Sequence, residues 1–395
     1  MERCRICGKA LCGEVLWHFI GQPAAAQELP DFLHRDEGVD FSVRRCASCG
    51  VIQLDCPAVP YFREVIRTAG LSREMREFRL KNFSAFIRRN SLQGKKVLEC
   101  GCGGGEYLSL LKECSSLPKG IDGGEKNVKN CLAKGLDAEK LYFETGEEKV
   151  AGGPFDGFCM LNVLEHIPHI PSYLAGIRNN LKEEGVGLVE VPDFDRMLKE
   201  NFFAEFIPDH LYYFTAETLR NTLEENGFAV LQEENVFHSY ILSMQVKKKR
   251  AGEKMSVARP EKTYENFSLE GMKEAEKAFT EELGKILSSS SSCAVWGASH
   301  QTFSVLAFLR ARFGEAFLAS KIPFVADSAP FKQGKITPAT HIPIVSPERL
   351  RQEKVGALLI MGGGYSDEIF RIAREEIHFP GKIYILRSSG LEQAQ

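Results

Sequence analysis

The chain has 395 residues, of which 44% are hydrophobic and 26% are charged, and its formal net charge at pH 7 is −3. This length is enough for two or three domains, and the apolar content is that of a chain that buries ordinary hydrophobic cores. The small negative charge argues against nucleic acid as a partner, because phosphate binding usually shows as a basic surplus. No apolar stretch has the length of a membrane helix, and residues 1–4 carry no secretory core, which predicts a cytoplasmic protein with no membrane partner.

Two CxxC pairs lie within the first fifty residues and consist of Cys4, Cys7, Cys46 and Cys49. Each pair places two thiolates on one turn, and two such turns complete a tetrahedral zinc site. Four cysteine ligands leave no open position, so the predicted zinc is structural. The alternative is two unrelated turns whose thiols stay reduced, as cytoplasmic thiols do. Cys12 and Cys56 are spare, because neither belongs to a pair.

The pattern Glu-x-Gly-x-Gly-x-Gly follows an apolar strand and is formed by Glu99, Gly101, Gly103 and Gly105. Glycines let the backbone turn tightly and lie close against a ligand. Asp122 ends the next predicted strand, 122 − 101 = 21 residues after the first of these glycines. An acid at that spacing hydrogen-bonds the ribose hydroxyls of a bound adenosine group. A dinucleotide-binding unit is the competing interpretation, but it normally shows Gly-x-Gly-x-x-Gly.

Strands and helices alternate from about residue 94 to 248, which predicts a parallel sheet. Apolar residues at helical spacing predict a helix over residues 61–92, immediately before this sheet. Two segments, 227–231 and 240–246, are expected to form an antiparallel pair that closes the sheet. In the cysteine-bearing region, residues 15–19 are expected to form part of a hairpin.

The basic run 247–250 marks a boundary and is interpreted as a solvated strand end. A charged helix over 261–287 and a serine turn over 288–292 follow it. A second α/β unit then starts at Cys293, and its last predicted strand is 382–386. A single glycine follows its first strand, so this unit is not expected to bind a second nucleotide cofactor.

The glycine-rich loop, the later acid and the segment Leu164-Glu165-His166-Ile167 stand in the order of the class I S-adenosylmethionine (SAM) methyltransferases, which the middle of the chain resembles. With the cysteine pairs before them, and the segments 327–334 and 341–344 after them, the whole chain resembles the tripartite sugar C-methyltransferases of deoxysugar pathways. The resemblance implies an α/β fold in three parts. These are a small zinc-binding domain (1–65), a Rossmann-like SAM-dependent methyltransferase domain (66–250) and a Rossmann-like C-terminal domain for the sugar nucleotide (251–395).

The same resemblance implies a cofactor, a substrate and an activity. SAM is the implied cofactor, and its implied binding residues are Glu99, Gly101, Gly103, Gly105, Asp122 and Asn162. The implied partner is a nucleotide-sugar substrate, gripped by the two outer domains and methylated at C3 of a 4-keto deoxyhexose.

Residues around the reacting carbon follow from the resemblance as well. A histidine in the Leu-Glu-His segment, a later Glu-His pair and a tyrosine after the zinc domain fall on His166, Asp209, His210 and Tyr61. The chain departs from the family in three places, where it has Asp209 for Glu, Ile207 for a tyrosine, and Gln301-Thr302 for a Lys-Gly pair. The structural alternatives are that His166 anchors its loop, that Asp209 caps a helix and that Tyr61 only packs.

C-methylation needs a carbon nucleophile, which forms when a base removes a proton beside a ketone. Histidine suits this task because its pKa lies near neutrality. An O- or N-methyltransferase acting on a sugar or glycan, in polysaccharide or natural-product biosynthesis, needs no enolate and tolerates Ile207. A zinc-containing binding protein with an inactive SAM fold is a third interpretation, against which the intact Glu99 and Asp122 argue.

Overall fold

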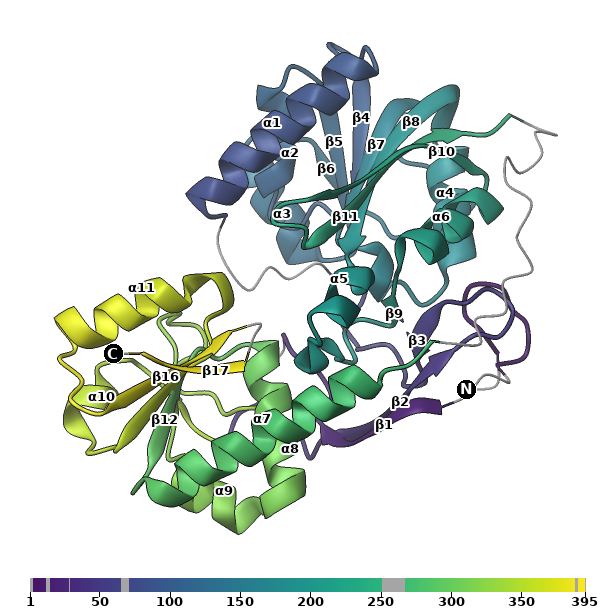
Figure 1. The fold of residues 1–395 in the computed structure, drawn as a ribbon. Helices are drawn as coiled ribbons and strands as arrows, with labels where there is room; N and C mark the ends of the chain where they lie inside the picture. Colours follow the sequence, from purple (N-terminus) through teal and green to yellow (C-terminus); the bar gives the residue numbers. More distant parts are fainter. Residues whose placement is uncertain are drawn as a thin grey trace.

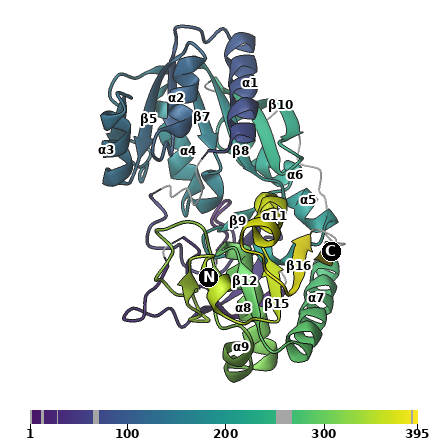
Figure 2. The same ribbon diagram turned by 90° about the vertical axis from the view of Figure 1, so that its left-hand side faces the viewer.

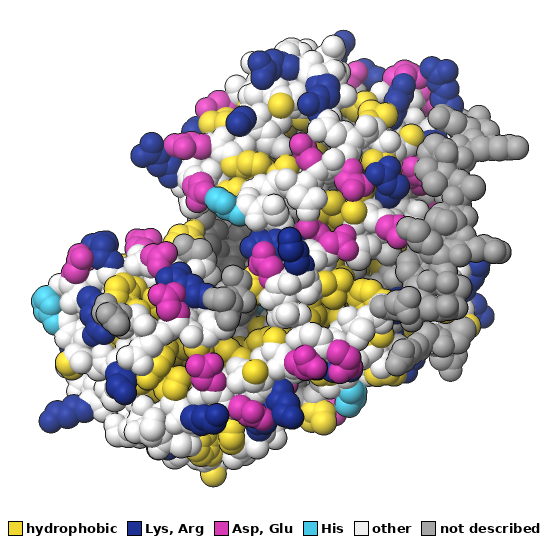
Figure 3. All heavy atoms as spheres, in the orientation of Figure 1, with side chains coloured by type: hydrophobic (Ala, Val, Ile, Leu, Met, Phe, Trp, Pro, Cys, Tyr) yellow, Lys and Arg dark blue, Asp and Glu magenta, His cyan; other side chains and the backbone are white. Residues whose placement is uncertain are grey.

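The computed structural model describes residues 3–11, 15–27, 29–64, 71–250, 267–387 and 390–394. Three β-sheets organise them, with four, seven and six strands. The body of the seven-stranded sheet lies above, and the N-terminal and C-terminal parts lie side by side beneath it (Figures 1 and 2). Figure 3 shows this face hollowed between the upper body and the C-terminal part, with acidic and basic side chains interspersed. No helix of the described residues is both long enough and apolar enough to cross a membrane.

The N-terminal sheet contains β1 (Val15–Gln22), β2 (Val39–Arg45) and β3 (Ile52–Leu54), all antiparallel. The hairpin of β1 and β2 confirms the prediction for this region. The fourth strand, β9 (Tyr212–Tyr213), comes from the middle of the chain and pairs with β3, Ile52 opposite Tyr213. The N-terminal sheet is therefore completed by a strand that begins two residues after His210.

The central sheet has the strand order β10-β11-β8-β7-β4-β5-β6. Its strands are β4 (Lys96–Cys100), β5 (Leu117–Asp122), β6 (Ala138–Lys140), β7 (Phe155–Leu161), β8 (Leu181–Pro192), β10 (Phe228–Val236) and β11 (Ile241–Lys248). Strands β4 to β8 run parallel, whereas β11 is antiparallel to both β8 and β10. The predicted parallel sheet and its closing antiparallel pair are confirmed. The carboxyl ends of its parallel strands form one edge, where such sheets bind ligands.

The helices around this sheet are α1 (Arg73–Arg89), α2 (Glu106–Glu113), α3 (Glu125–Ala133), α4 (Ile170–Asn179), α5 (Phe194–Lys199) and α6 (Ala216–Glu225). Helix α1 begins after Ser72, whose side chain accepts a hydrogen bond from the Met75 N–H. The predicted helix over 61–92 is too long, because residues 61–64 form a turn and residues 65–70 lie outside the described part. The basic run forms the end of β11 and the two residues after it, where Lys247 and Arg250 pair with Glu184.

The C-terminal sheet has the order β14-β13-β12-β15-β16-β17. Its strands are β12 (Cys293–Trp296), β13 (Val325–Ala326), β14 (Ile344–Val345), β15 (Ala357–Ile360), β16 (Lys382–Arg387) and β17 (Gly390–Ala394). Its helices are α7 (Glu270–Ser289), α8 (His300–Phe313), α9 (Glu315–Lys321), α10 (Arg349–Gln352) and α11 (Ser366–Arg371). The prediction that 382–386 is the last strand is wrong, since β17 turns back antiparallel beside it. Helix α7 also runs into the serine segment, and the first residues of the predicted helix, 261–266, lie outside the described part.

The two outer parts share one hydrophobic core. The ring of Phe308 from α8 lies 5.6 Å from that of Phe19 and 6.1 Å from that of Trp17. Polar contacts join the same two parts, because Arg310 donates to the Gly21 carbonyl at 2.6 Å. His341, in the C-terminal motif singled out by the sequence, lies 2.8 Å from the Asp36 carbonyl through Nε2. This histidine therefore joins the outer parts to each other.

Candidate active site

The glycine-rich loop links β4 to α2 at the carboxyl edge of the central sheet. Gly101, Gly103 and Gly105 have φ values of +72°, +53° and +85°, in the left-handed region that favours glycine. A Cβ atom on Gly105 would lie 2.6 Å from a methyl carbon of Leu136, which is too close for any larger residue. The backbone conformation therefore favours glycine at all three positions, and packing requires it at Gly105.

Asp122 lies at the end of β5 beside this loop and is buried. Its Oδ2 accepts the Gly103 N–H at 3.0 Å, and its Oδ1 accepts the Gly124 N–H at 2.8 Å and the Asn127 amide at 3.0 Å. The carboxylate is thus fixed against the glycine-rich loop. Glu99, in β4, is buried at the same sheet edge. A glycine loop with an adjacent fixed acid fits the adenosine part of SAM.

The segment after the N-terminal sheet packs on the turn that follows β5, next to Asp122. The Gly123 N–H donates to the Arg63 carbonyl at 3.1 Å, and a Cβ atom on Gly123 would lie 2.3 Å from that oxygen. The Arg63 guanidinium lies over the rings of Phe62 and Tyr142, at 4.3 and 5.5 Å, and forms an ion pair with Glu144. This contact, which the sequence did not predict, connects the N-terminal part to the turn between β5 and α3.

Asn162 follows β7 with a φ of +53°, and its N–H donates to the Glu190 carbonyl of β8 at 2.8 Å. Its side-chain oxygen is buried with no hydrogen-bond partner among the described residues. Asn162 thus lies at the carboxyl end of β7, which is paired with β4. This position agrees with the predicted role in the cofactor site, which stays a prediction.

His166 and His210 come together although they lie far apart in the sequence. His166 ends the short 3₁₀ helix η1 (Leu164–His166), and its Nδ1 lies 2.7 Å from the Asp209 carbonyl oxygen. A carbonyl can only accept, so Nδ1 carries the proton and Nε2 keeps the lone pair. The two imidazole rings lie 4.8 Å apart at 70°. The structure therefore presents two adjacent imidazoles, one of them with a defined tautomer.

The electrostatic surroundings of His210 keep its ring neutral. Burial is the largest influence and lowers the pKa of His210 well below its ordinary value, and the nearby His166 and His300 lower it further. A neutral imidazole is the form that accepts a proton. His210 is only partly exposed, so little water competes for its lone pair.

Asp209 joins three separate segments. Its Oδ1 accepts a hydrogen bond from the Tyr61 hydroxyl at 2.6 Å, and its Oδ2 accepts the Ala26 N–H at 2.8 Å. The interpretation of Asp209 as a helix cap is wrong, because residues 208–209 form a turn that leads into β9. The interpretation of Tyr61 as a packing residue only is wrong as well, since its hydroxyl reaches the turn that carries His210.

Two positions at which the chain differs from the family pattern, Ile207 and Gln301, make specific contacts. Ile207 is buried, and its N–H donates to the Tyr213 hydroxyl at 2.9 Å. Gln301 donates to Oε1 of the buried Glu205 at 2.6 Å, and Nε2 of His300 lies 3.3 Å from its Oε2. His300 and Gln301 are the first two residues of helix α8 in the C-terminal part. They form a contact with the central part that the sequence did not predict.

The four paired cysteines form one cluster. Cys4 Sγ lies 3.7 Å from Cys49 Sγ, and Cys7 Sγ lies 3.6 Å from Cys46 Sγ, and all four sulfurs lie within 4.8 Å of one another. Tetrahedral zinc with Zn–S distances of about 2.3 Å places its sulfurs about 3.8 Å apart. The cluster therefore fits a zinc ion. Cys56 is buried outside this cluster, and Cys12 lies outside the described residues.

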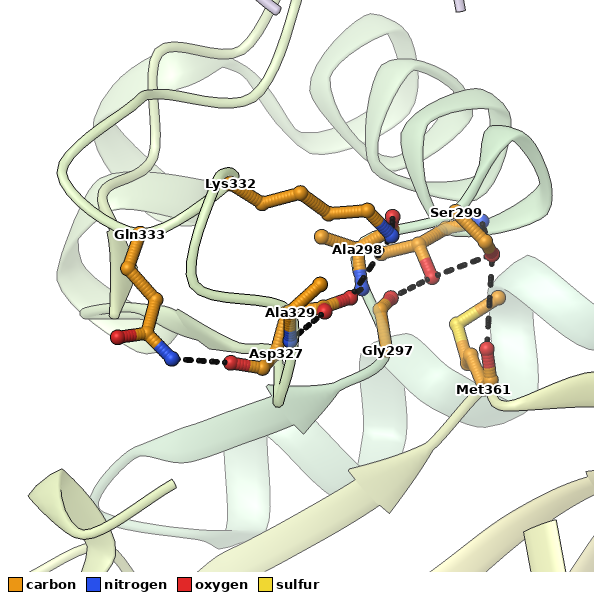
Figure 4. Close-up of polar contacts among 9 residues, drawn as sticks. Gly297, Ala298, Ser299, Asp327, Ala329, Lys332, Gln333 and Met361 are labelled. Atoms are coloured by element: carbon orange, nitrogen blue, oxygen red, sulfur yellow. Dashed lines mark hydrogen bonds and ion pairs between the residues drawn. The ribbon is translucent and has the colours of Figure 1, made fainter. Parts of the chain in front are cut away.

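The Asp-x-x-Pro-x-Lys-Gln-Gly segment builds a loop at the carboxyl ends of β12 and β13 (Figure 4). Oδ2 of Asp327 accepts the Ala298 N–H at 2.8 Å and pairs with Lys332 Nζ at 3.1 Å. Lys332 also donates to the Ala298 carbonyl at 2.8 Å, and the Gln333 amide donates to the Asp327 carbonyl at 2.9 Å. These side chains hold the loop after β12 in place.

The fold and the loop chemistry define a SAM-dependent methyltransferase. The family model "Methyltransferase domain" matches residues 71–233, and "C-methyltransferase C-terminal domain" matches residues 229–386. The chain therefore combines a methyltransferase domain with a C-methyltransferase C-terminal domain.

The chain is similar to several individual proteins. C-methyltransferase NovU of Streptomyces niveus is 25% identical across 98% of this chain and 95% of its own length. The ubiquinone biosynthesis O-methyltransferase of Nitrosococcus oceani is 33% identical over 25% of this chain and 45% of its own length. The crystal structure of the PH0226 protein from Pyrococcus horikoshii OT3 covers 49% of this chain and all of that chain, with 15% identity and a TM-score of 0.40.

Proposed function

We propose that the protein transfers the SAM methyl group to a carbon beside a ketone, at C3 of a nucleotide-linked 4-keto deoxyhexose. The observation that carries this proposal is the convergence of His166, His210 and the Tyr61–Asp209 pair, which come from three separate segments. NovU, which is similar along nearly the whole chain, is named a C-methyltransferase and supports carbon as the acceptor.

The cofactor site in this proposal consists of the glycine-rich loop with Asp122, Glu99 and Asn162. Asp122 would hold the ribose hydroxyls, and the left-handed glycines would let the loop backbone approach the cofactor. SAM supplies an electrophilic methyl group on a sulfonium. The contribution of the chain is to align the acceptor with that methyl group, because alignment removes much of the entropic barrier.

His210 is the proposed base. Its ring is neutral, so it can take the proton from the carbon beside the ketone while the electron pair moves onto the carbonyl oxygen. His166 keeps a free Nε2 because its Nδ1 faces the Asp209 carbonyl. The Tyr61 hydroxyl is committed to Asp209, so this pair positions the turn that carries His210. The paired cysteines would hold a structural zinc ion that ties the first residues to the sheet of β1, β2 and β3.

The test is a turnover assay in deuterated water with SAM and a set of nucleotide-linked 4-keto deoxyhexoses, analysed by mass spectrometry. Methylated product with solvent deuterium exchange at the α-carbon, both lost in His210→Ala, supports the proposal. Protein that binds SAM but gives neither product nor exchange with any member of the set contradicts it.

O- or N-methylation of a sugar is the second candidate. The favouring observation is Ile207, an apolar buried residue where the resemblance implies a tyrosine. Methyl transfer to a hydroxyl or amine needs no enolate, so product would form while deuterium at the neighbouring carbon is retained.

A further inference from the structure

Glu165, His166 and His210 place one carboxylate and two imidazoles around a common point. Their ligating atoms all lie within 4.8 Å of one another. We propose that these three side chains form a reversible site for a divalent transition-metal ion such as Zn²⁺, separate from the cysteine cluster, and that the bound ion inhibits methyl transfer. The proposed metal binding is inferred from the geometry alone, whereas the proposed inhibition of methyl transfer rests on the proposed function.

The surroundings of His166 are those of a metal ligand. Its Nδ1 faces the Asp209 carbonyl at 2.7 Å, which fixes the tautomer and leaves the Nε2 lone pair free. Metal-bound histidines usually donate their other ring N–H to a carboxylate or a backbone carbonyl in this way. Nε2 faces Oε1 of Glu165 at 3.8 Å, a separation suited to two ligands of one ion and too long for a hydrogen bond.

The Glu165 carboxylate is an independent observation. Its side chain is 2% exposed, and neither carboxylate oxygen has a hydrogen-bond partner among the described residues. Burying a carboxylate without hydrogen-bond partners costs free energy. A cation between the Glu165 carboxylate and the two imidazoles removes that cost. The backbone is already arranged for this, because the Leu211 N–H donates to the Glu165 carbonyl at 2.8 Å and holds the His210 turn against η1.

The donor set selects the kind of ion. Two imidazoles and one carboxylate suit Zn²⁺ and its neighbours, whereas Mg²⁺ and Ca²⁺ prefer oxygen alone. Ligands about 2.0–2.2 Å from one Zn²⁺ lie at most about 4.4 Å apart, so small side-chain movements complete the site. Three protein ligands leave a position open, unlike the closed set of four cysteines.

Inhibition follows from two physical effects. An imidazole whose lone pair binds an ion cannot take a proton, so the ion and the substrate proton compete for His210. In the proposed reaction the SAM sulfonium faces the same acceptor carbon, and a dication there repels it. The ion therefore removes the base and disfavours the cofactor at once.

The experiment measures metal stoichiometry in the whole 395-residue chain. Wild-type protein purified with zinc and dialysed against EDTA is titrated with Zn²⁺ or Co²⁺ under equilibrium dialysis. The expected result is two ions per chain, one of them removed by EDTA, and thiolate-to-cobalt absorption identifies the cysteine-bound ion. Glu165→Gln and His210→Gln are each expected to bind only the cysteine-held ion. His238→Gln, a change at an exposed histidine paired with Glu74, is the matched control and is expected to keep both ions.

A wild-type ratio of one ion, or two ions in both Glu165→Gln and His210→Gln, overturns the site. For the inhibitory role, the rate of methyl transfer should fall as the second ion binds and return with EDTA. A rate that stays constant or rises as this ion binds overturns inhibition. Absence of methyl transfer in protein that is free of the second ion, yet able to bind it, counts against the proposed function and leaves the metal site standing.

Discussion

The Tyr61 hydroxyl donates a 2.6 Å hydrogen bond to Oδ1 of Asp209, across 148 positions of sequence. Tyr61 belongs to the segment that leaves the N-terminal sheet, and Asp209 belongs to the turn before β9. The same carboxylate accepts the Ala26 N–H, so the N-terminal part holds this turn at two points. The position of His210 therefore depends on how the N-terminal part packs against the central one.

Removing this hydroxyl tests that dependence. Tyr61→Phe leaves the ring in place but takes one donor from a buried carboxylate, at a cost of about 1.5–3 kcal/mol for a hydrogen bond to a charged group. We expect a large fall in kcat with little change in SAM affinity, measured by turnover and calorimetry. Tyr384→Phe, on β16, is the control and should leave both unchanged. Unaltered kcat in Tyr61→Phe would show that the contact does not position the site.

Asp122 gives a prediction for cofactor binding. Asp122→Ala leaves the Gly103 and Gly124 N–H groups without their acceptor and removes the proposed ribose ligand. We expect SAM affinity to fall at least about tenfold, or 1.4 kcal/mol, in calorimetry. Asp156→Ala is a matched control, because Asp156 lies near the amino end of β7, at the opposite sheet edge. Equal affinity for SAM in Asp122→Ala and wild type would contradict the assignment of the cofactor loop.

Local pattern was enough to predict the cofactor loop and the cysteine cluster. A strand followed by alternating glycines can adopt few backbone conformations. Asp122 lies at the end of the next strand, a position that does not depend on the packing of the rest of the chain. By contrast, the Ala26–Asp209 contact spans 183 positions and the Glu205–His300 contact spans 95. Such contacts arise from the packing of one part on another, which no local periodicity encodes.

Family resemblance predicted His166 and His210 as site residues, but it did not indicate how they are held. The tautomer of His166 depends on a backbone carbonyl, and any residue at position 209 would supply that group. Two-residue β9 was missed for a related reason. It exists only because β3 offers a sheet edge to it, and the segment has no alternation long enough to predict a strand.

The cysteine cluster gives a prediction about metal and stability. Cys46→Ser removes one of four thiolates, so we expect the cysteine-held zinc to be lost and the melting temperature to fall, because structural zinc contributes folding free energy directly. Metal analysis and calorimetry measure these two effects. Cys114→Ser is the control, since this half-buried thiol lies outside the cluster. A Cys46→Ser protein with full metal content and unchanged melting would contradict the zinc proposal.

The Glu205–His300 contact predicts a pH-dependent stability. Burial alone lowers the pKa of His300, but Glu205, with a smaller contribution from Asp209, outweighs it and raises that pKa above its ordinary value. A raised pKa in the folded state contributes stability that is fully present below about pH 6.5 and is lost as the pH rises through the raised pKa. Burial also raises the pKa of Glu205, but His300 and Gln301 lower it overall, so its contribution is lost only in acid, as the pH falls through its folded pKa.

The measurement compares wild type with His300→Gln by thermal melting across pH. We expect the melting temperature of wild type to exceed that of His300→Gln at about pH 6. This difference in melting temperature should shrink as the pH rises through the raised pKa of His300. His238→Gln is the control, because His238 and Glu74 are exposed and such pairs contribute little. A difference that grows toward alkaline pH would contradict the ion pair.

Arg79 and Glu190 form an ion pair whose two side chains are both 0% exposed. Arg79 comes from α1 and Glu190 from β8, and the guanidinium lies 4.7 Å from the ring centre of Tyr107, in the first turn of α2.

Removing one partner leaves the other charge buried and unpaired. We therefore expect Arg79→Met or Glu190→Gln to lower the free energy of unfolding by about 3–5 kcal/mol in urea denaturation. The double variant should lose less than the sum of the two single variants, because no charge then remains unpaired. Glu77→Gln, which breaks an exposed pair with Arg73, should change stability by less than about 1 kcal/mol. Additive losses in the double variant would show that the two side chains act independently, and that α1 is held over the central sheet by its apolar residues alone.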